Sequence, residues 1–269
     1  MSTPLEPREV DKPHLRRWLR ATFDLFVRSP LRFGLLIAAL GWLDTSAVKV
    51  TAGVVIEKQW VDRVGMVLLP VVWTAVSAVA RGADDACQTW TAIRSLAKRR
   101  VLGGALRPGV EIAVWTWVVA WSLSGLVQVL MPARPDPYLG HSGELLESVG
   151  VQAVLVFGFV GLCYFPLLVL IPDISASAAR HLSHRASLLN DRMTMLLFVG
   201  AAALIADRVA SLFPAYGMTM ATCIVFLGVF NYVAYRDIFE RRSGNLPKAV
   251  ASTARIDTGA QGTSDVPSA

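Results

Sequence analysis

Long apolar segments separated by short charged bands constrain this chain more than any other feature of its sequence. Of the 269 residues, 54% are hydrophobic and 17% are charged, whereas water-soluble domains contain about 45–50% apolar and about 25% charged residues. The excess apolar residues lie in long uncharged runs, which disfavours a water-soluble fold. The net charge of +6 lies in bands between these runs, so the charge does not indicate a nucleic-acid partner, and none is expected.

The stretch from Leu15 to Leu40 shows how an apolar run is introduced. Its first part carries a helical stripe with spacings of three and four residues, made of Leu15, Trp18, Leu19, Thr22, Phe23 and Phe26. The stripe ends before Ser29-Pro30, where serine suits an N-cap and proline suits the first position of a helix. We therefore predict an amphipathic helix followed directly by a membrane span.

The same pattern recurs and predicts an all-α, polytopic membrane bundle. We expect about six transmembrane helices, at about 31–55, 64–80, 108–131, 149–171, 193–213 and 218–235, and three interfacial amphipathic helices, at about 13–28, 84–102 and 173–189. Together they form a single membrane domain over residues 13–240. The polar flanking segments 1–12 and 241–269 are expected to be disordered. The weak residue identity of the three units leaves open whether they arose by duplication.

Local signals predict where several of these segments begin and end. Arg81-Gly82 is expected to end the second span, Asp84 to cap the second amphipathic helix, and Gly103-Gly104 to break that helix. Pro108 is expected to open the third span, which would place Glu111 favourably near a helix N-terminus.

The distribution of Lys and Arg predicts the orientation of the spans. With six spans, both termini and all three amphipathic helices lie on one side, which holds most of the 26 basic residues. The other side holds five, namely Lys49, Lys58, Arg63, Arg134 and Arg208. By the positive-inside rule, the termini are cytoplasmic and the acidic loop at 132–148 faces out. The expected location is the bacterial cytoplasmic (inner) membrane.

The basic faces of the amphipathic helices are candidate contacts for lipid head groups. Each basic residue near an anionic inner leaflet contributes about 1 kcal/mol, and an amphipathic helix with aromatic and arginine faces suits the interface. The candidates are Arg16, Arg17, Arg20, Arg94, Lys98, Arg180 and Arg185. A second interpretation of the first amphipathic helix is that its apolar stripe packs on the spans.

Charged residues inside the spans form the most specific candidate site. Each costs about 2.5–3.5 kcal/mol at the centre of a bilayer. Asp44, Asp207 and Arg208 occur at similar depth toward the outer face, and Lys49 lies nearer still to the outside. We hypothesise an ion pair between Asp44 and Arg208. Such a pair would either fix helix packing or belong to a path for ions or protons.

No motif of a catalytic or cofactor site occurs in the sequence. Motifs of the GxSxG, HExxH, Walker and GxGxxG types are absent. His181 and His184 have the spacing of two metal ligands, but they lack a third ligand nearby, which favours a solvated polar face. Neither an enzyme nor a cofactor or metal site is expected.

Three short motifs resemble a family of six-span bacterial inner-membrane proteins of uncharacterised activity. They are Leu25-Phe26-Val27-Arg28-Ser29-Pro30-Leu31, Leu68-Leu69-Pro70 and Tyr232-Val233-Ala234-Tyr235-Arg236-Asp237-Ile238-Phe239. The resemblance implies a fold and a location, and it carries no catalytic residues. This chain departs from the family pattern in its longer outer loop and its polar tail.

These observations favour a non-enzymatic membrane protein that organises the membrane or is a component of an assembly. Its expected partners are the anionic inner leaflet and either a second copy or another membrane protein. The alternative is a transporter of small solutes or ions with a polar path around Asp44, Asp207 and Arg208.

Overall fold

The computed structural model describes residues 6–10, 14–53, 58–85, 89–130, 149–211 and 216–240. In this part of the chain every regular element is a helix and none is a strand. The predicted all-α class is therefore confirmed for these residues. The segments at 132–148 and 241–269, for which a loop and a disordered tail are predicted, lie outside them.

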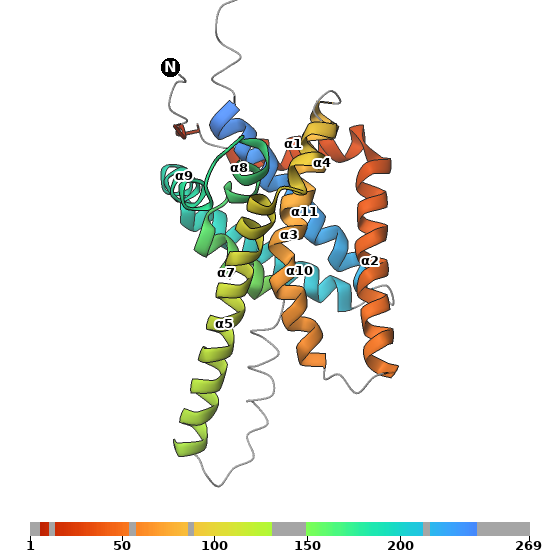
Figure 1. Cartoon of the computed structure of the whole chain (residues 1–269), viewed down its shortest axis with the longest axis vertical. Helices are drawn as coiled ribbons and strands as arrows, with labels where there is room; N and C mark the ends of the chain where they lie inside the picture. Colours follow the sequence, from red (N-terminus) through yellow and green to blue (C-terminus); the bar gives the residue numbers. More distant parts are fainter. Residues whose placement is uncertain are drawn as a thin grey trace, which may run out of the picture.

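The described elements follow one another along the chain as helices (Figure 1). In chain order they are α1 (His14–Arg28), α2 (Pro30–Gly53), α3 (Lys58–Asp84), α4 (Thr89–Leu96), α5 (Arg99–Leu130), α7 (Val149–Val160), α8 (Tyr164–Leu170), α9 (Ala176–Leu189), α10 (Arg192–Ser211), α11 (Tyr216–Tyr235) and the π-helical turn η2 (Arg236–Glu240). The break between α1 and α2 falls at Ser29, with Pro30 as the first residue of α2, as the sequence predicts.

Helix α3 lies at the centre of the bundle, where it packs against α4, α5, α8 and α11. Its Trp73 is fully buried, and the indole ring lies 4.6 Å from the ring of Phe157 and 5.6 Å from that of Phe165. The indole Nε1 donates a hydrogen bond to the carbonyl oxygen of Ile224 at 3.1 Å. An aromatic cluster from α3, α7 and α8 thus forms the middle of the core.

Two glycines let neighbouring helices approach α3 closely. A Cβ atom at Gly109 of α5 would lie 2.5 Å from the carbonyl oxygen of Val67, and one at Gly228 of α11 would lie 2.6 Å from Cγ1 of Val76. Neither distance is possible for a real side chain without movement of its neighbour. Small residues at such contacts are typical of helix packing in membranes, where close backbone approach replaces the hydrophobic effect.

Two helices of the described part are long and apolar enough to cross a membrane. The qualifying segments are Val67–Asp84, in α3, and Gly217–Glu240, in α11 and η2. A third span is obtained if α7 and α8 are taken together, although they are bent by 64° with respect to each other. The helical fold with two or three such helices supports a membrane protein.

The second span does not end where the sequence predicts. Helix α3 continues through Arg81 and Gly82 to Asp84, and it already begins at Lys58, before the expected start at 64. Asp84 is therefore the last residue of a helix and not the N-cap of the next one. The prediction failed because residues at the end of α3 are held by partners on α11, described below.

The break in the second amphipathic helix also lies at a different position from the one that the sequence predicts. The chain breaks at Ala97-Lys98, between α4 and α5, and α5 runs without interruption through Gly103, Gly104 and Pro108. Helical glycine costs about 1 kcal/mol relative to alanine. Contacts with α8 oppose this cost, because the hydroxyl of Tyr164 donates to the carbonyl oxygen of Gly104 at 2.7 Å.

The expected fourth span is interrupted at Gly161-Leu162-Cys163. Gly161 has a φ of +81°, and the amides that follow it bond to α9 and not within a helix. The N–H of Leu162 donates to Ser187 Oγ at 3.1 Å, and that of Cys163 donates to Ser183 Oγ at 3.0 Å. These two serines satisfy backbone groups that a bend would otherwise leave unpaired in a buried place.

Substitution of Gly161 tests this junction. Gly161→Ala should lower the free energy of unfolding by about 2–4 kcal/mol, because of the left-handed backbone and the clash of a Cβ atom with Ser183. Gly103→Ala is the matched control, because a Cβ atom there meets nothing within 4 Å. The control should raise stability by about 0.5–1 kcal/mol. Thermal unfolding in detergent measures both changes, and equal stability of the two variants would contradict the account.

Candidate functional site

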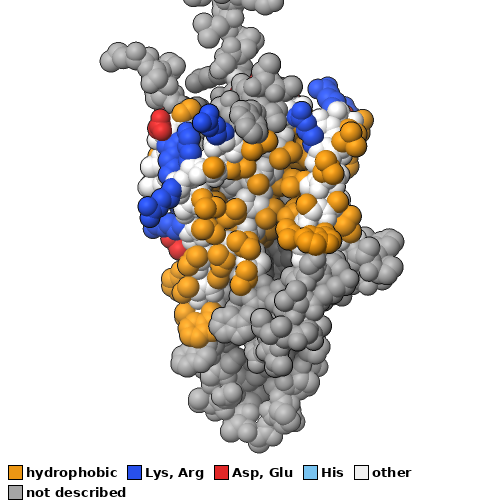
Figure 2. Space-filling model, turned by 45° about the vertical axis from the view of Figure 1, so that its right-hand side comes forward, with side chains coloured by type: hydrophobic (Ala, Val, Ile, Leu, Met, Phe, Trp, Pro, Cys, Tyr) orange, Lys and Arg blue, Asp and Glu red, His pale blue; other side chains and the backbone are white. Residues whose placement is uncertain are grey.

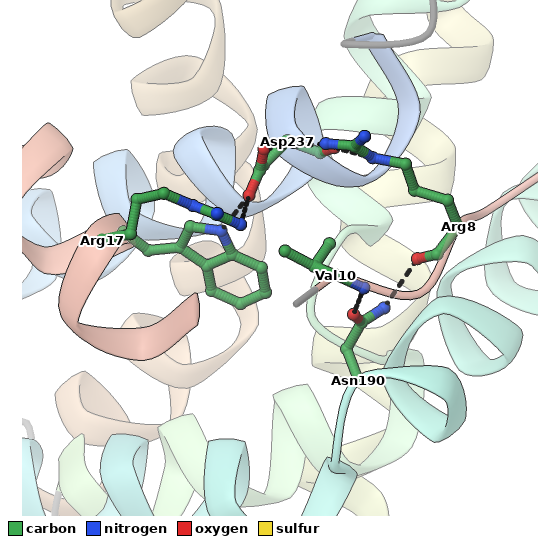
Figure 3. Close-up of polar contacts among 6 residues, drawn as sticks. Arg8, Val10, Arg17, Asn190 and Asp237 are labelled. Atoms are coloured by element: carbon green, nitrogen blue, oxygen red, sulfur yellow. Dashed lines mark hydrogen bonds and ion pairs between the residues drawn. The ribbon is translucent and has the colours of Figure 1, made fainter. Parts of the chain in front are cut away.

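A buried carboxylate on the π-helical turn η2 organises the most elaborate polar site of the described residues. Asp237 lies on η2 and is only 4% exposed. Its Oδ1 accepts a hydrogen bond from Arg8 Nη2 at 3.0 Å, and its Oδ2 accepts from Arg17 Nη2 at 2.6 Å (Figure 3). Trp18 Nε1 also donates to Oδ2, at 2.8 Å. The two ion pairs and the indole hydrogen bond offset the cost of removing this charge from water.

Residues 6–10, which we call the N-terminal strap, lie against this site. The N–H of Arg8 donates to the carbonyl oxygen of Ile238 at 3.3 Å, and Arg8 Nε donates to that of Asp237 at 2.6 Å. Asn190, at the end of α9, accepts from the N–H of Val10 at 2.8 Å and donates to the carbonyl oxygen of Arg8 at 3.1 Å (Figure 3). The expectation that residues 1–12 are disordered is therefore wrong for residues 6–10.

Two further sets of ion pairs tie α11 and η2 to the end of α3. Asp84 accepts two hydrogen bonds from Arg236 Nη1, at 2.7 and 2.8 Å, and one from the hydroxyl of Tyr232 at 2.9 Å. One turn earlier, Arg81 Nη1 donates to both carboxylate oxygens of Glu240, at 2.8 and 2.6 Å. Carboxylates are disfavoured near a helix C-terminus, so the facing guanidinium groups are needed to stabilise them.

We call these groups the terminal ion-pair cluster, and its members are Arg8, Arg17, Trp18, Arg81, Asp84, Tyr232, Arg236, Asp237 and Glu240. Each carboxylate in it faces at least one guanidinium group. Such an arrangement suits a structural joint, because each ion pair links two segments that are far apart in the sequence. Among the described residues, no three His, Cys, Asp or Glu side chains lie together as they would around a metal ion.

The sequence contains a pattern that indicates this cluster, but its local context suggests a helix N-cap at Asp84 instead. Both α3 and α11 end an apolar run with a charged set, Arg81-Gly82-Ala83-Asp84 in one and Arg236-Asp237 in the other. Acidic and basic residues together at the ends of two apolar helices indicate reciprocal pairing if the helices lie side by side. The sequence alone did not show that they do.

The four predicted intramembrane charges lie on two helices. Helix α2 carries Asp44 and Lys49, and α10 carries Asp207 and Arg208. All four side chains lie outside the described part of the structure. The Asp44–Arg208 ion pair therefore stays a prediction.

The predicted lipid head-group contacts fall into two groups. The side chains of Arg16, Arg20, Arg94, Lys98 and Arg185 lie in exposed or half-exposed positions. Arg17 instead bonds to Asp237, and Arg180 lies with its guanidinium carbon 3.7 Å from the centre of the Phe159 ring.

The apolar stripe of α1 packs largely on the protein. Trp18, Thr22 and Leu25 are buried, with the Trp18 ring in edge contact with Phe230 of α11. Phe23, in contrast, is 59% exposed. The second interpretation of this helix, packing against the spans, therefore holds for the centre of the stripe.

Two polar residues have surroundings that the sequence does not indicate. Glu111 does not lie near a helix N-terminus, since α5 begins at Arg99; it accepts a hydrogen bond from Arg107 Nε at 2.7 Å, one turn earlier. The second residue, Asn231, lies in α11. Its amide is fully buried, and neither its oxygen nor its nitrogen has a hydrogen-bond partner among the described residues.

His184, one of the two histidines with metal-ligand spacing, has a structural partner. Its Nε2 lies 2.7 Å from the carbonyl oxygen of Phe159, to which it donates a hydrogen bond. His181 is exposed. Burial lowers the pKa of His184 below its ordinary value; the hydrogen bond to Phe159 opposes this effect, and the positive charges of Arg192 and Arg180 add to it.

Comparison of the chain with protein families, with curated proteins and with solved structures finds no match. The resemblance to six-span inner-membrane proteins therefore rests on its three short motifs. One of them, Tyr232 to Phe239, coincides with the segment that supplies Tyr232, Arg236 and Asp237 to the terminal ion-pair cluster.

Removal of the buried charge tests the cluster. Asp237→Asn should lower the free energy of unfolding by about 2 kcal/mol, because Arg8 and Arg17 lose an ionic partner but remain partly solvated. Thermal unfolding in detergent measures the effect. Asp24→Asn, at an exposed carboxylate of α1, is the control and should change stability by less than about 0.5 kcal/mol. Equal effects of the two substitutions would contradict a structural role for Asp237.

The lowered pKa of His184 predicts a pH dependence of stability. As pH falls below about 6.5, the unfolded chain gains a proton at this position before the folded chain does, so the folded state loses relative stability. The melting temperature of the wild type should therefore fall more between about pH 7 and about pH 5 than that of His184→Gln. His181→Gln, at the exposed neighbour, should behave like the wild type. Parallel pH profiles for the wild type and His184→Gln would rule this out.

Proposed function

We propose that this protein is a non-enzymatic, multi-pass protein of the bacterial cytoplasmic membrane that organises the membrane or serves as a component of a membrane assembly. In this proposal the six spans are α2, α3, α5, the bent pair of α7 and α8, α10 and α11. Helices α1, α4 and α9 and both termini are cytoplasmic. The lengths support it, since α2 has 24 residues, α5 has 32 and α10 has 20, and about 20 residues cross a bilayer.

The observation that carries the proposal is a broad exposed apolar surface beneath a basic edge. On α2, Leu31, Leu35 and Trp42 are 80%, 71% and 68% exposed, and on α5 Trp115 is 64% exposed. Figure 2 shows apolar side chains over much of one face, with Lys and Arg gathered above them. Surface of this kind is unfavourable in water and suits lipid or another membrane helix, and the basic edge suits the cytoplasmic side.

The terminal ion-pair cluster supports an organising role over an enzymatic one. It joins the N-terminal strap, α1, α3 and η2 at the same end of the bundle through paired charges. A joint of this kind holds the helix ends in fixed positions. A rigid basic end and the outward-facing side of α2, which stands at the edge of the bundle (Figure 1), are suited to contact with the anionic leaflet and with a neighbouring protein.

Site-specific photo-crosslinking in native membranes tests the assembly role. A photoreactive side chain at Leu35 or Trp42, both on the exposed side of α2, should give one discrete protein adduct of the same mass from both positions. The adduct is either a dimer of this chain or a complex with another membrane protein. The same group at the fully buried Trp73 should give no such adduct.

Absence of any discrete protein adduct from α2, and from Val114 and Trp115 on α5, would contradict an assembly component. The topology is checked separately with alkaline phosphatase fusions in the same cells. A fusion after Arg242 should be inactive and one after Pro137 active. Strong activity after Arg242 would contradict the proposed orientation.

A further inference from the structure

A polar cavity opens between α5, α7, α8 and α9, and none of its lining residues belongs to the terminal ion-pair cluster. Its volume is about 390 Å³, including the part open to the surface. Its lining residues include Arg107, Glu111, Phe159, Tyr164, Ser177 and Arg180. These residues come from four helices that contact one another, so the cavity is part of the tertiary fold and not a gap beside a single helix.

Two arginines at this cavity are held in place by groups that leave donors available. Glu111 accepts from Arg107 Nε at 2.7 Å, and its other oxygen lies 3.9 Å from Arg180 Nη1. The guanidinium group of Arg180 stacks on the ring of Phe159 at 3.7 Å. Because one carboxylate faces two guanidinium groups, this set of charged side chains carries a net positive charge. Planar guanidinium groups bind phosphate oxygens well, often through two parallel hydrogen bonds.

The start of α9 adds to this preference for an anion. Ala176 and Ser177 are the first two residues of this 14-residue helix, and both line the cavity. The first N–H groups of a helix lack acceptors within the helix, and the helix dipole favours negative charge at this end. The N–H of Ala178, by contrast, donates to the side chain of Ser175. The arginines and the start of α9 therefore favour the same kind of ligand.

An exposed apolar track leads away from the cavity along one face of α5. Val110, Val114 and Val118 follow Arg107 at spacings of three, seven and eleven residues, and they are 47%, 54% and 38% exposed. At about 1.5 Å per residue the track extends about 16 Å below the arginine. Trp115 and, on α7, Leu155 are also exposed. A free phosphate ion would make no contact with this apolar track, whereas the acyl chain of a lipid would pack along it favourably.

We propose that this cavity is a specific site for an anionic phospholipid, with the lipid phosphate between Arg107, Arg180 and the start of α9, and an acyl chain along Val110, Val114 and Val118. The net positive charge of the site selects a phosphodiester head group without a compensating amine. The proposal rests on the membrane placement proposed above and assigns a lipid class to one place on its surface.

Native mass spectrometry of the full-length, delipidated protein in detergent tests the site. Phosphatidylglycerol should bind with a stoichiometry of one at low lipid concentration. Its apparent affinity should fall at least about tenfold in the variant with both Arg107→Gln and Arg180→Gln, since each arginine supplies charge-assisted hydrogen bonds. The matched control carries Arg28→Gln and Arg99→Gln, two exposed arginines outside the cavity, and should bind as the wild type does.

Further measurements distinguish the possible ligands and test whether the variants are folded. Phosphatidylethanolamine should bind at least about tenfold more weakly than phosphatidylglycerol, and millimolar inorganic phosphate should not displace the lipid. Arg107→Gln alone, at a side chain that is 72% exposed, should keep the wild-type melting temperature without lipid and still weaken binding. Unchanged lipid affinity in the double variant, equal binding of both lipids, or displacement by inorganic phosphate would each overturn the proposal. Recovery of the variants in the membrane fraction reports on membrane placement independently.

Discussion

The charge of Asp237 is the constraint on which the geometry of this end of the bundle depends. An isolated carboxylate is costly to bury, and this one is 4% exposed. Its partners come from far away in the sequence, since Arg8 and Arg17 precede it by 229 and 220 residues. To supply them, the N-terminal segment must cross the end of the bundle and α1 must lie against α11. The burial of Trp18 follows from the same placement, because its indole both packs on Phe230 and donates to the carboxylate.

Hydrogen-bond satisfaction also determines where the apolar helices bend. In the interior of a bundle, a break exposes backbone groups that water cannot reach, and each must find another partner. At the junction of α7 and α8, Ser183 and Ser187 of α9 provide these partners. Helix α9 is thus joined to the spans through its buried side, while its first turn lines the cavity next to α5. The same helix supports both the bend and the proposed lipid site.

In the terminal ion-pair cluster, the local sequence does not predict which residues pair with one another. Asp84 was interpreted as an N-cap because an aspartate before a helical pattern has that role in many proteins. Its partners, Tyr232 and Arg236, lie 148 and 152 residues further along the chain. Arg17 was grouped with the lipid-facing arginines because it follows Arg16 on the polar side of the stripe, yet it faces Asp237. In both cases the residue type was informative, and the partner was decided by which helices lie side by side.

By itself, the sequence determined the helical class, the membrane character, the boundary of α1 and α2 at Ser29, and the segregation of basic residues. These properties depend on hydropathy over a window of residues or on groups within one helical turn. The tertiary structure decided the continuity of α3 and α5 through their glycines, the bend after Val160 and the partners of the charges. Those outcomes depend on contacts between distant segments, where packing and hydrogen bonds contribute more than the local cost of about 1 kcal/mol for a glycine in a helix.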